Sequence, residues 1–339
     1  GLLLFSKSNY SMRLRLFIVL WFSTSVFLDA QNEGTYPSGS STNGYGYSNY
    51  YQKGWQFYGN SSINTSQSSF SNWQGGGLSS ISIYTSLSLN LNYFGEKVKW
   101  ESGLNAGYGL MLQGEDTEWF KSDDRLDINT KIGIRASEKW YYTSSLSFFS
   151  QFQPGYYGIG DSLPISNFLS PGYVTGALGF DFNPSSKLSI VLGPITSKNT
   201  IVLDQNLANM GAYGVEPGVY DYFEEKFITE GKNLRSETGG SINITYNNPR
   251  ILKNVGVISR LFLFSNYLEK PENIDVNFET QLNMQVNENI STNLTLHLIY
   301  DDDIMIALDE TGTNFGPRLQ FKEVLSVGLN ILLGNPYSY

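Results

Sequence analysis

His297 is the only histidine of the chain and the side chain best suited to acid–base chemistry near neutral pH. Leu294, Leu296 and Leu298 alternate around it, which predicts that His297 points to the opposite, polar face of a strand. A serine hydrolase would need a serine and an orienting group beside the imidazole. Asp301 shares this face but lies about 13 Å farther along an extended strand, and serines are too numerous to single out a nucleophile. We therefore expect a polar, non-catalytic histidine, with lipid hydrolysis as the lesser alternative.

Asp301, Asp302 and Asp303 offer three consecutive carboxylates, the hard oxygen ligands that Ca²⁺ prefers. The spaced acidic pattern of a calcium loop is missing, so a solvated acidic loop is the stronger expectation, and we predict no metal and no cofactor. The chain has no Cys, which excludes thiolate ligands, a Cys nucleophile and disulfides. Its net charge of −9 argues against nucleic-acid binding.

Many charged residues fall in the polar phase of alternating segments. Such a set can form either the selective wall of a pore or internal ion pairs that brace it. The near balance of eight cations and seven anions favours bracing, because a selective wall usually has one sign in excess. They are Lys99, Arg125, Lys131, Arg135, Arg235, Arg260, Arg318 and Lys322 against Glu101, Asp127, Asp181, Glu237, Asp275, Glu279 and Asp301.

The elements that carry these residues alternate with a period of two. In 80–93, "SISIYTSLSLNLNY", most apolar residues are odd-numbered and most small polar residues are even-numbered, and 97–112, 125–136 and 274–286 behave in the same way. This period predicts strands and not helices. Twelve such segments begin near Trp55, Leu78, Lys97, Asp124, Lys139, Pro171, Lys187, Leu234, Asn254, Glu272, Ile290 and Arg318.

The connections between these segments differ systematically in length. An even number of strands, with short turns at one end and long loops at the other, is typical of an outer-membrane barrel. The predicted tight turns are 95–97, 137–138, 183–186, 247–254 and 287–289, and the long loops are 113–123, 153–170, 198–233 and 301–317. Loop 198–233 is the longest, and its aromatic residues predict either a plug in the lumen or a surface for a partner.

Strand length and aromatic residues separate this interpretation from a soluble sandwich. Soluble strands usually have about 5–6 residues, whereas these segments reach the 9–11 or more that a tilted strand needs to cross a bilayer. Trp and Tyr also gather at segment ends, as in the aromatic girdles of membrane barrels. Those beside tight turns include Tyr93, Trp100, Trp140, Tyr142, Phe182 and Tyr246, and those beside the long loops include Trp73, Tyr108, Phe152, Tyr173, Tyr267 and Tyr300.

The N-terminal region predicts export. Residues 12–30 have the basic start and apolar core of a signal peptide, with cleavage expected before Gln31. We expect residues 1–11 to be upstream extra sequence, 31–53 to be a flexible leader rich in Gly, Ser and Tyr, 54–334 to be the barrel and 335–339 to be a short tail.

Several stretches resemble a Bacteroidota family of outer-membrane β-barrels of unknown function (DUF3078-like). They include "DDRLDINTKIGIRASEKWYY" (123–142), "ISNFLSPGYVT" (165–175), "FSNYLEKPENIDVNFE" (264–279) and "GPRLQFKEVLSVGLN" (316–330), and together with further matches, among them 54–77, they cover nearly all of 54–330. The resemblance implies a fold and a location in the outer membrane. No catalytic or ligand-binding residues are established for that family, so none can be carried over.

We predict an all-β protein, a single transmembrane antiparallel up-and-down barrel of about 12 strands in the outer membrane of a Gram-negative cell. Its expected partner is outer-membrane lipid, and the alternative function below adds other outer-membrane proteins. The predicted function is a porin-like passage for small solutes and not an enzyme. The alternative is an accessory subunit of a larger outer-membrane complex, and a lipid hydrolase is a distant third. The candidate lumen residues are Lys99, Glu101, Arg125, Asp127, Lys131, Arg135, Arg235, Glu237, Asp275, Glu279, His297, Asp301, Arg318 and Lys322.

Overall fold

The computed structural model describes residues 53–69, 79–114, 118–156, 162–287, 289–304, 306–307 and 314–334. The predicted upstream sequence, signal peptide, tail and nearly all of the leader lie outside this part of the chain, as does Trp73. No helix among the described residues is long and apolar enough to cross a membrane.

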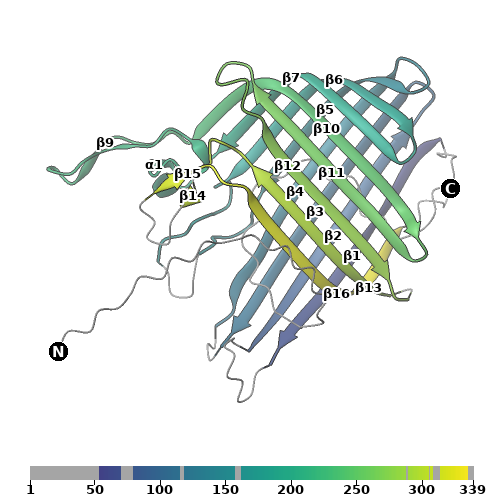
Figure 1. The fold of residues 1–339 in the computed structure, drawn as a ribbon, viewed down its shortest axis with the longest axis horizontal. Coiled ribbons are helices and arrows are strands. Elements are labelled where there is room, and N and C mark those ends of the chain that lie inside the picture. The colour runs from purple at the N-terminus through teal and green to yellow at the C-terminus, as the bar shows by residue number, and fades with distance from the viewer. Residues whose placement is uncertain are drawn as a thin grey trace, which may run out of the picture.

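Twelve long strands form one closed antiparallel barrel, which confirms the predicted fold class (Figure 1). Neighbouring barrel strands are consecutive in sequence, and β1 closes the ring by pairing with β16. Closure leaves no free edge, so the backbone groups of each strand are paired on both sides. The strands are β1 (Gly54–Ser68), β2 (Ser80–Phe94), β3 (Val98–Gln113), β4 (Phe120–Arg135), β5 (Trp140–Ser150), β6 (Gly172–Ser185), β7 (Leu188–Ile201), β10 (Leu234–Leu252), β11 (Val255–Asn266), β12 (Asp275–Gln285), β13 (Ile290–Tyr300) and β16 (Gln320–Gly334).

The two ends of the barrel differ as the connections predict. We call the end with the short connections β2–β3, β4–β5, β6–β7, β10–β11 and β12–β13 the turn end, and the opposite end the loop end. The start of β1 and the end of β16 both lie at the turn end. The loop end carries the short elements α1 (Gln205–Asn209), η1 (Ala212–Gly214), β8 (Val219–Asp221), β9 (Lys226–Thr229), β14 (Ile306–Ala307) and β15 (Phe315–Gly316).

Two predicted turns are shorter than expected. In the first, 183–186, β6 continues to Ser185, which pairs with Leu188; the second connects β10 and β11. Residues 247–254 were expected to form the connection, but β10 continues to Leu252 and the pairing with β11 shifts register between Asn248 and Leu252. Pro249 lies at this shift. Proline has no N–H to donate to the ladder, so within a sheet it is tolerated at a bulge. The chain reverses at Lys253 and Asn254, and Asn254 has a φ of 60°, a left-handed conformation that asparagine tolerates better than most residues.

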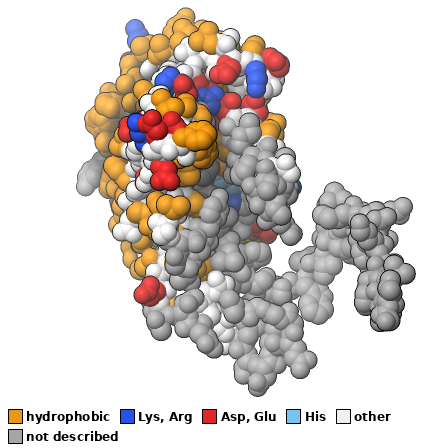
Figure 2. Space-filling model, turned by 90° about the vertical axis from the view of Figure 1, so that its left-hand side faces the viewer, with side chains coloured by type: hydrophobic (Ala, Val, Ile, Leu, Met, Phe, Trp, Pro, Cys, Tyr) orange, Lys and Arg blue, Asp and Glu red, His pale blue; other side chains and the backbone are white. Residues whose placement is uncertain are grey.

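The apolar faces of the strands point outward. Ile132 is 41% exposed, and Leu146, Leu325 and Ile331 are more exposed still. Among the described residues the buried side chains are mostly polar or charged. In the view toward the loop end, hydrophobic side chains cover the flank of the barrel (Figure 2). This distribution is opposite to that of a soluble β-sandwich, which buries its apolar faces.

Aromatic side chains form contacts on the outer face at the turn end. The ring of Trp55 lies 5.3 Å from that of Tyr93 and 5.6 Å from that of Trp100, measured between centroids. Trp140 stacks on Phe182 at 4.6 Å. These contacts join strands one or two positions apart, within four residues of their turn-end termini, where an aromatic girdle is expected.

The long connection between β7 and β10 has two parts. In the first, Val202, Leu207, Ala208 and Val215 form a small apolar core around α1 and η1, and Tyr213 Oη donates to Ile165 O of a neighbouring connection. In the second, the β8–β9 hairpin extends away from the barrel (Figure 1). The hairpin therefore does not enter the lumen.

Candidate functional site in the barrel lumen

The first group of inward-pointing charges lies near the turn end. Asp181 on β6 is completely buried, and its Oδ2 lies 2.7 Å from Lys99 Nζ and 2.9 Å from Lys131 Nζ. Lys131 also lies 3.0 Å from Glu101, and Ser189 Oγ donates to Asp181 Oδ1. Two cations and two anions thus neutralise one another and join β3, β4 and β6.

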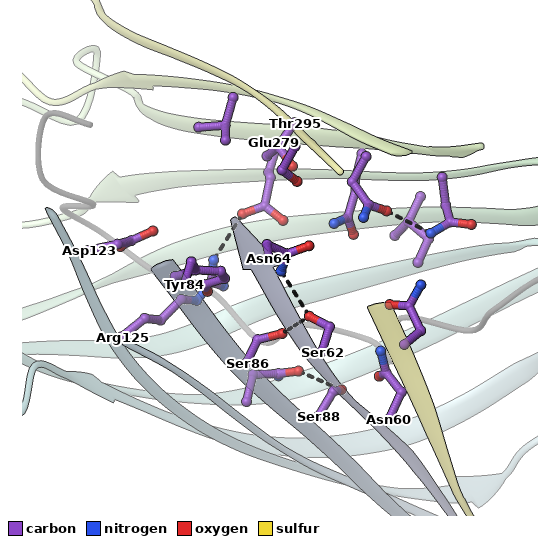
Figure 3. A pocket seen from close by; sticks show the side chains of 18 of the residues that line it. Asn60, Ser62, Asn64, Tyr84, Ser86, Ser88, Asp123, Arg125, Glu279 and Thr295 are labelled. Atoms are coloured by element: carbon purple, nitrogen blue, oxygen red, sulfur yellow. Dashed lines mark hydrogen bonds and ion pairs between the residues drawn. The ribbon is translucent and has the colours of Figure 1, made fainter. Parts of the chain in front are cut away.

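The second group crosses the middle of the lumen. Arg125 Nη1 on β4 lies 3.3 Å from Glu279 Oε2 on β12, and these strands are six positions apart in the ring of twelve. The pair therefore spans the barrel between opposite walls (Figure 3). Arg260 on β11 lies 3.0 Å from the other oxygen of Glu279, and Arg125 also pairs with Asp127.

The third group lies at the loop end and surrounds Lys198. Its Nζ is 2.7 Å from Asp275, 3.1 Å from Asp301 and 3.7 Å from Glu237. Arg235 pairs with Glu237 and with Asp303 at the same end. This group links β7, β10 and β12 to the connection that follows β13.

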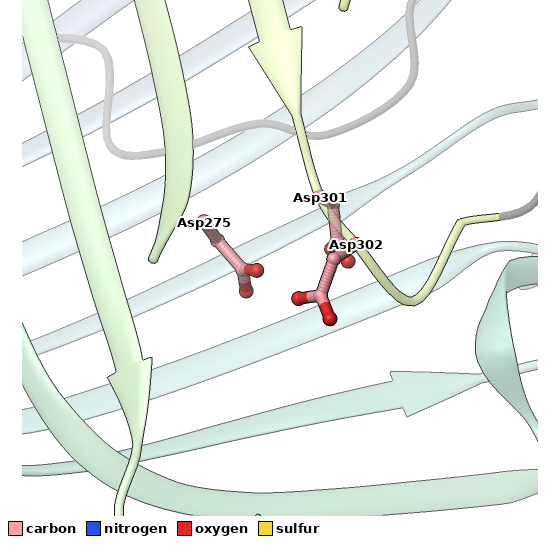
Figure 4. A group of neighbouring side chains, drawn as sticks. All are labelled: Asp275, Asp301 and Asp302. Atoms are coloured by element: carbon pink, nitrogen blue, oxygen red, sulfur yellow. The ribbon is translucent and has the colours of Figure 1, made fainter. Parts of the chain in front are cut away.

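The predicted calcium ligands belong to this third group. The carboxylates of Asp275, Asp301 and Asp302 converge (Figure 4), and one oxygen from each lies within 4.8 Å of the others. The ammonium group of Lys198 contacts two of them, and Asn273 Nδ2 donates to Asp302. The expectation of a solvated acidic loop is wrong for Asp301, whose side chain is only 13% exposed, because the charge of Lys198 holds it inside the barrel mouth.

His297 lies inside the barrel, and its side chain is buried. Its Nε2 is 3.0 Å from Asn277 Oδ1, an amide oxygen that accepts a hydrogen bond from the ring. This amide oxygen cannot take the place of the serine hydroxyl that a hydrolase would need beside the imidazole. Glu279 and Lys322 lie opposite it on the neighbouring strands. The position is that of a polar lumen residue.

Two of the predicted lumen residues lie elsewhere. Arg135 is exposed at the end of β4, where its guanidinium donates to Tyr141 Oη, and Arg318 is exposed in the connection before β16. Alternation places a residue on a face only while the strand continues, and both positions lie at or beyond a strand end. Lys322 is on β16 and lies 3.5 Å from Asp123 on β4.

A further set of hydrogen bonds, around Asp124 and Lys121, was not predicted. Asp124 accepts hydrogen bonds from the backbone N–H groups of Phe152 and Gln153, and Lys121 Nζ lies 3.1 Å from Asp124 and 2.7 Å from Gln153 O. These bonds attach the connection after β5 to the start of β4. No local pattern marks them, because the partners of Asp124 are backbone groups 28 and 29 residues away.

A polar cavity of about 290 Å³ lies beside the central ion pair (Figure 3). Its neutral wall is built mainly by β1 and β2, whose residues 54–68 and 80–94 contain no charged side chain. Ser62 Oγ and Ser86 Oγ are 2.7 Å apart, and Asn64 Nδ2 donates to Ser62 Oγ. The other neutral polar lining residues include Asn60, Ser88, Asn105, Gln281, Asn283, Asn293, Thr295, Ser326 and Asn330.

Comparison with known proteins confirms the predicted resemblance over part of the chain. Residues 65–156, from the end of β1 to just beyond β5, match the family model described as protein of unknown function (DUF3078). No curated protein matches the chain. The Bacteroidota source that the resemblance implies stays a prediction.

Solved barrels resemble the chain only distantly. The translocator domain of the autotransporter NalP from Neisseria meningitidis is 8% identical, with a TM-score of 0.34, over 83% of this chain and 89% of that one. An outer-membrane channel from Pseudomonas putida F1 is 12% identical, with a TM-score of 0.36, over 83% and 96%. The NanC porin is 8% identical, with a TM-score of 0.35, over 82% and 99%. At these scores the likenesses carry no functional argument.

Proposed function

We propose that this chain is an outer-membrane barrel protein, and not an enzyme, that provides a passage for small polar solutes. The outward apolar faces support a bilayer location, because only a structure whose backbone groups are all paired is stable in hydrocarbon, and a closed barrel meets this condition. The Trp and Tyr contacts at the turn end support an interface at that level. By the usual arrangement of such barrels, the turn end faces the periplasm and the loop end faces outward.

The observation that carries the proposal is the polar cavity beside the Arg125–Glu279 pair, whose wall from β1 and β2 carries no charge. A lumen that served only as a support would gain stability from filling this space, since protein interiors are normally close-packed. Hydroxyl and amide groups at the wall replace part of the hydration of a polar solute. The ion pairs then hold the opposite walls apart at a constant distance.

Single-channel recording of the refolded protein in planar bilayers tests the proposal. Steady openings support a passage, and silence from protein that is demonstrably folded contradicts it. Folding is checked in the same sample by the change in gel mobility on boiling. Cell fractionation checks the location, and N-terminal sequencing of the membrane form checks the predicted cleavage before Gln31.

The second candidate is an accessory subunit of a larger outer-membrane complex, and the β8–β9 hairpin favours it. Tyr222 is 84% exposed and Phe223 is fully exposed at the tip of the hairpin, which is unusual for aromatic side chains without a partner surface. Purification in mild detergent would recover a stoichiometric partner that a Tyr222→Ser, Phe223→Ser variant loses.

The distant third candidate is a lipid hydrolase. It would be supported only by lipid turnover that is lost in the His297→Ala variant.

A further inference from the structure

We propose that the lumen cavity binds neutral polyhydroxylated solutes of monosaccharide size, in preference to ions of the same size. This inference rests on the proposed passage and names its substrate class.

The charged groups that line the cavity have partners of opposite sign within the protein. Glu279 contacts both Arg125 and Arg260, and Lys322 lies 3.5 Å from Asp123. An anionic or cationic solute would have to displace one of these partners and leave a buried charge uncompensated, which is costly. A neutral solute disturbs none of them.

The rest of the wall suits hydroxyl groups. More than half of the lining residues are Ser, Thr, Asn or Gln, whose hydroxyl and amide groups both donate and accept, as sugar hydroxyls do. Asn64 Oδ1 and Asn247 Oδ1 accept no hydrogen bond within the described part of the chain. Both oxygens are buried, and Asn64 Oδ1 faces Gly328, so they add to the polarity of the wall without contacting a solute directly.

The shape and size of the cavity restrict the class of solute further. Tyr84 lines the cavity and is labelled beside Arg125 in Figure 3. Its ring provides a flat surface against which the C–H face of a pyranose can pack. At about 290 Å³ the cavity lies at the lower end of the range for small-molecule sites, roughly 300–1,000 Å³. One sugar ring fits this size better than an oligosaccharide does.

The test uses the folded full chain in detergent and saturation-transfer NMR with three probes of similar size: methyl β-D-glucoside, gluconate and glucosamine. We expect the glucoside to give the strongest transfer, with gluconate and glucosamine at least about fivefold weaker. Equal or stronger transfer to a charged probe overturns the proposal.

A matched pair of variants locates the site. Asn283 lines the cavity, and its Nδ2 donates to Asn293 Oδ1. Asn243 on β10 has the same inward parity as the lining residue Asn247 but is not part of the cavity wall. Asn283→Leu should weaken glucoside binding about fivefold to tenfold, as the loss of about one hydrogen bond predicts, and Asn243→Leu should leave it unchanged. If both variants bind the glucoside equally well, the proposed position of the site in the cavity is wrong.

Recording from the same preparation in planar bilayers separates this inference from the proposed function. Silent bilayers with a retained glucoside signal contradict the passage and support the sugar site. Steady openings without a glucoside signal support the passage and contradict the sugar site.

Discussion

The lumen of this barrel has two walls of different construction. β1 and β2 carry no charged residue over their whole described length, and their inward side chains are mostly serine and asparagine. The strands from β3 to β12 carry the ion-paired groups around Asp181, Glu279 and Lys198. The cavity lies between the first wall and residues of β10 to β13 and β16, beside the central ion-paired group.

The difference teaches how side-chain length divides the interior of a barrel of this size. Barrels of about eight strands are filled by side chains, and those of 16–18 strands leave a channel. With twelve strands, Arg, Lys and Glu are long enough to meet across the lumen, whereas Ser and Asn stay close to their own strand. The space is therefore set by the distribution of long charged and short neutral residues around the ring.

The largest effect is expected from Asp181→Asn in the ionic wall. The substitution removes the fully buried carboxylate that Lys99 and Lys131 share and leaves them only Glu101. Removing one partner of a buried ion pair typically costs about 3–5 kcal/mol, so we expect a large fall in the urea midpoint of the refolded barrel in lipid vesicles.

The matched control for this prediction is Glu96→Gln. Glu96 pairs with Lys53 in an exposed connection at the turn end, where an ion pair contributes at most about 1 kcal/mol. If Asp181→Asn changed the midpoint no more than this control does, the ionic wall would not brace the barrel.

An intermediate effect is expected from Glu279→Gln in the central group. Arg125 and Arg260 lose the carboxylate that they share, so the lumen gains positive potential and should favour anions. The reversal potential under a KCl gradient should shift toward that of chloride, with a severalfold rise in the anion-to-cation permeability ratio.

Charge restoration gives the control for this change in selectivity. The double variant Arg125→Gln, Glu279→Gln removes one charge of each sign and should return the reversal potential close to the original value. A shift that persists in the double variant would show that selectivity does not depend on this ion pair.

The smallest effect is expected in the neutral wall. Ser62→Ala removes the hydroxyl that contacts both Ser86 and Asn64, and one hydrogen bond contributes about 1 kcal/mol to stability. Ser66→Ala, at an exposed position of the same strand, should stay within about 0.5 kcal/mol of the original chain. Urea unfolding measures both, and a cost for Ser62→Ala as large as that for Asp181→Asn would remove the distinction between the two walls.

Local sequence patterns predict the strands, their faces and the two ends of the barrel. A period of two requires no distant partner: it places Ile132 outward and Lys131 inward wherever the strand pairs. Connection lengths are local as well, which is why the turn end and loop end are predicted correctly. The two turns that are shorter than predicted, 183–186 and 247–254, lie where the ladder shifts register around Pro184 and Pro249.

Only the tertiary structure decided which inward charges meet. Arg125 and Glu279 are 154 residues apart and come together because ring closure sets their strands on opposite walls. Lys198 reaches three carboxylates from β10, β12 and the connection after β13, whereas Arg135 and Arg318 lie at or beyond a strand end. Alternation assigns a side chain to a face, but the partner on that face depends on strand order, stagger and where each strand ends, and these are properties of the closed sheet as a whole.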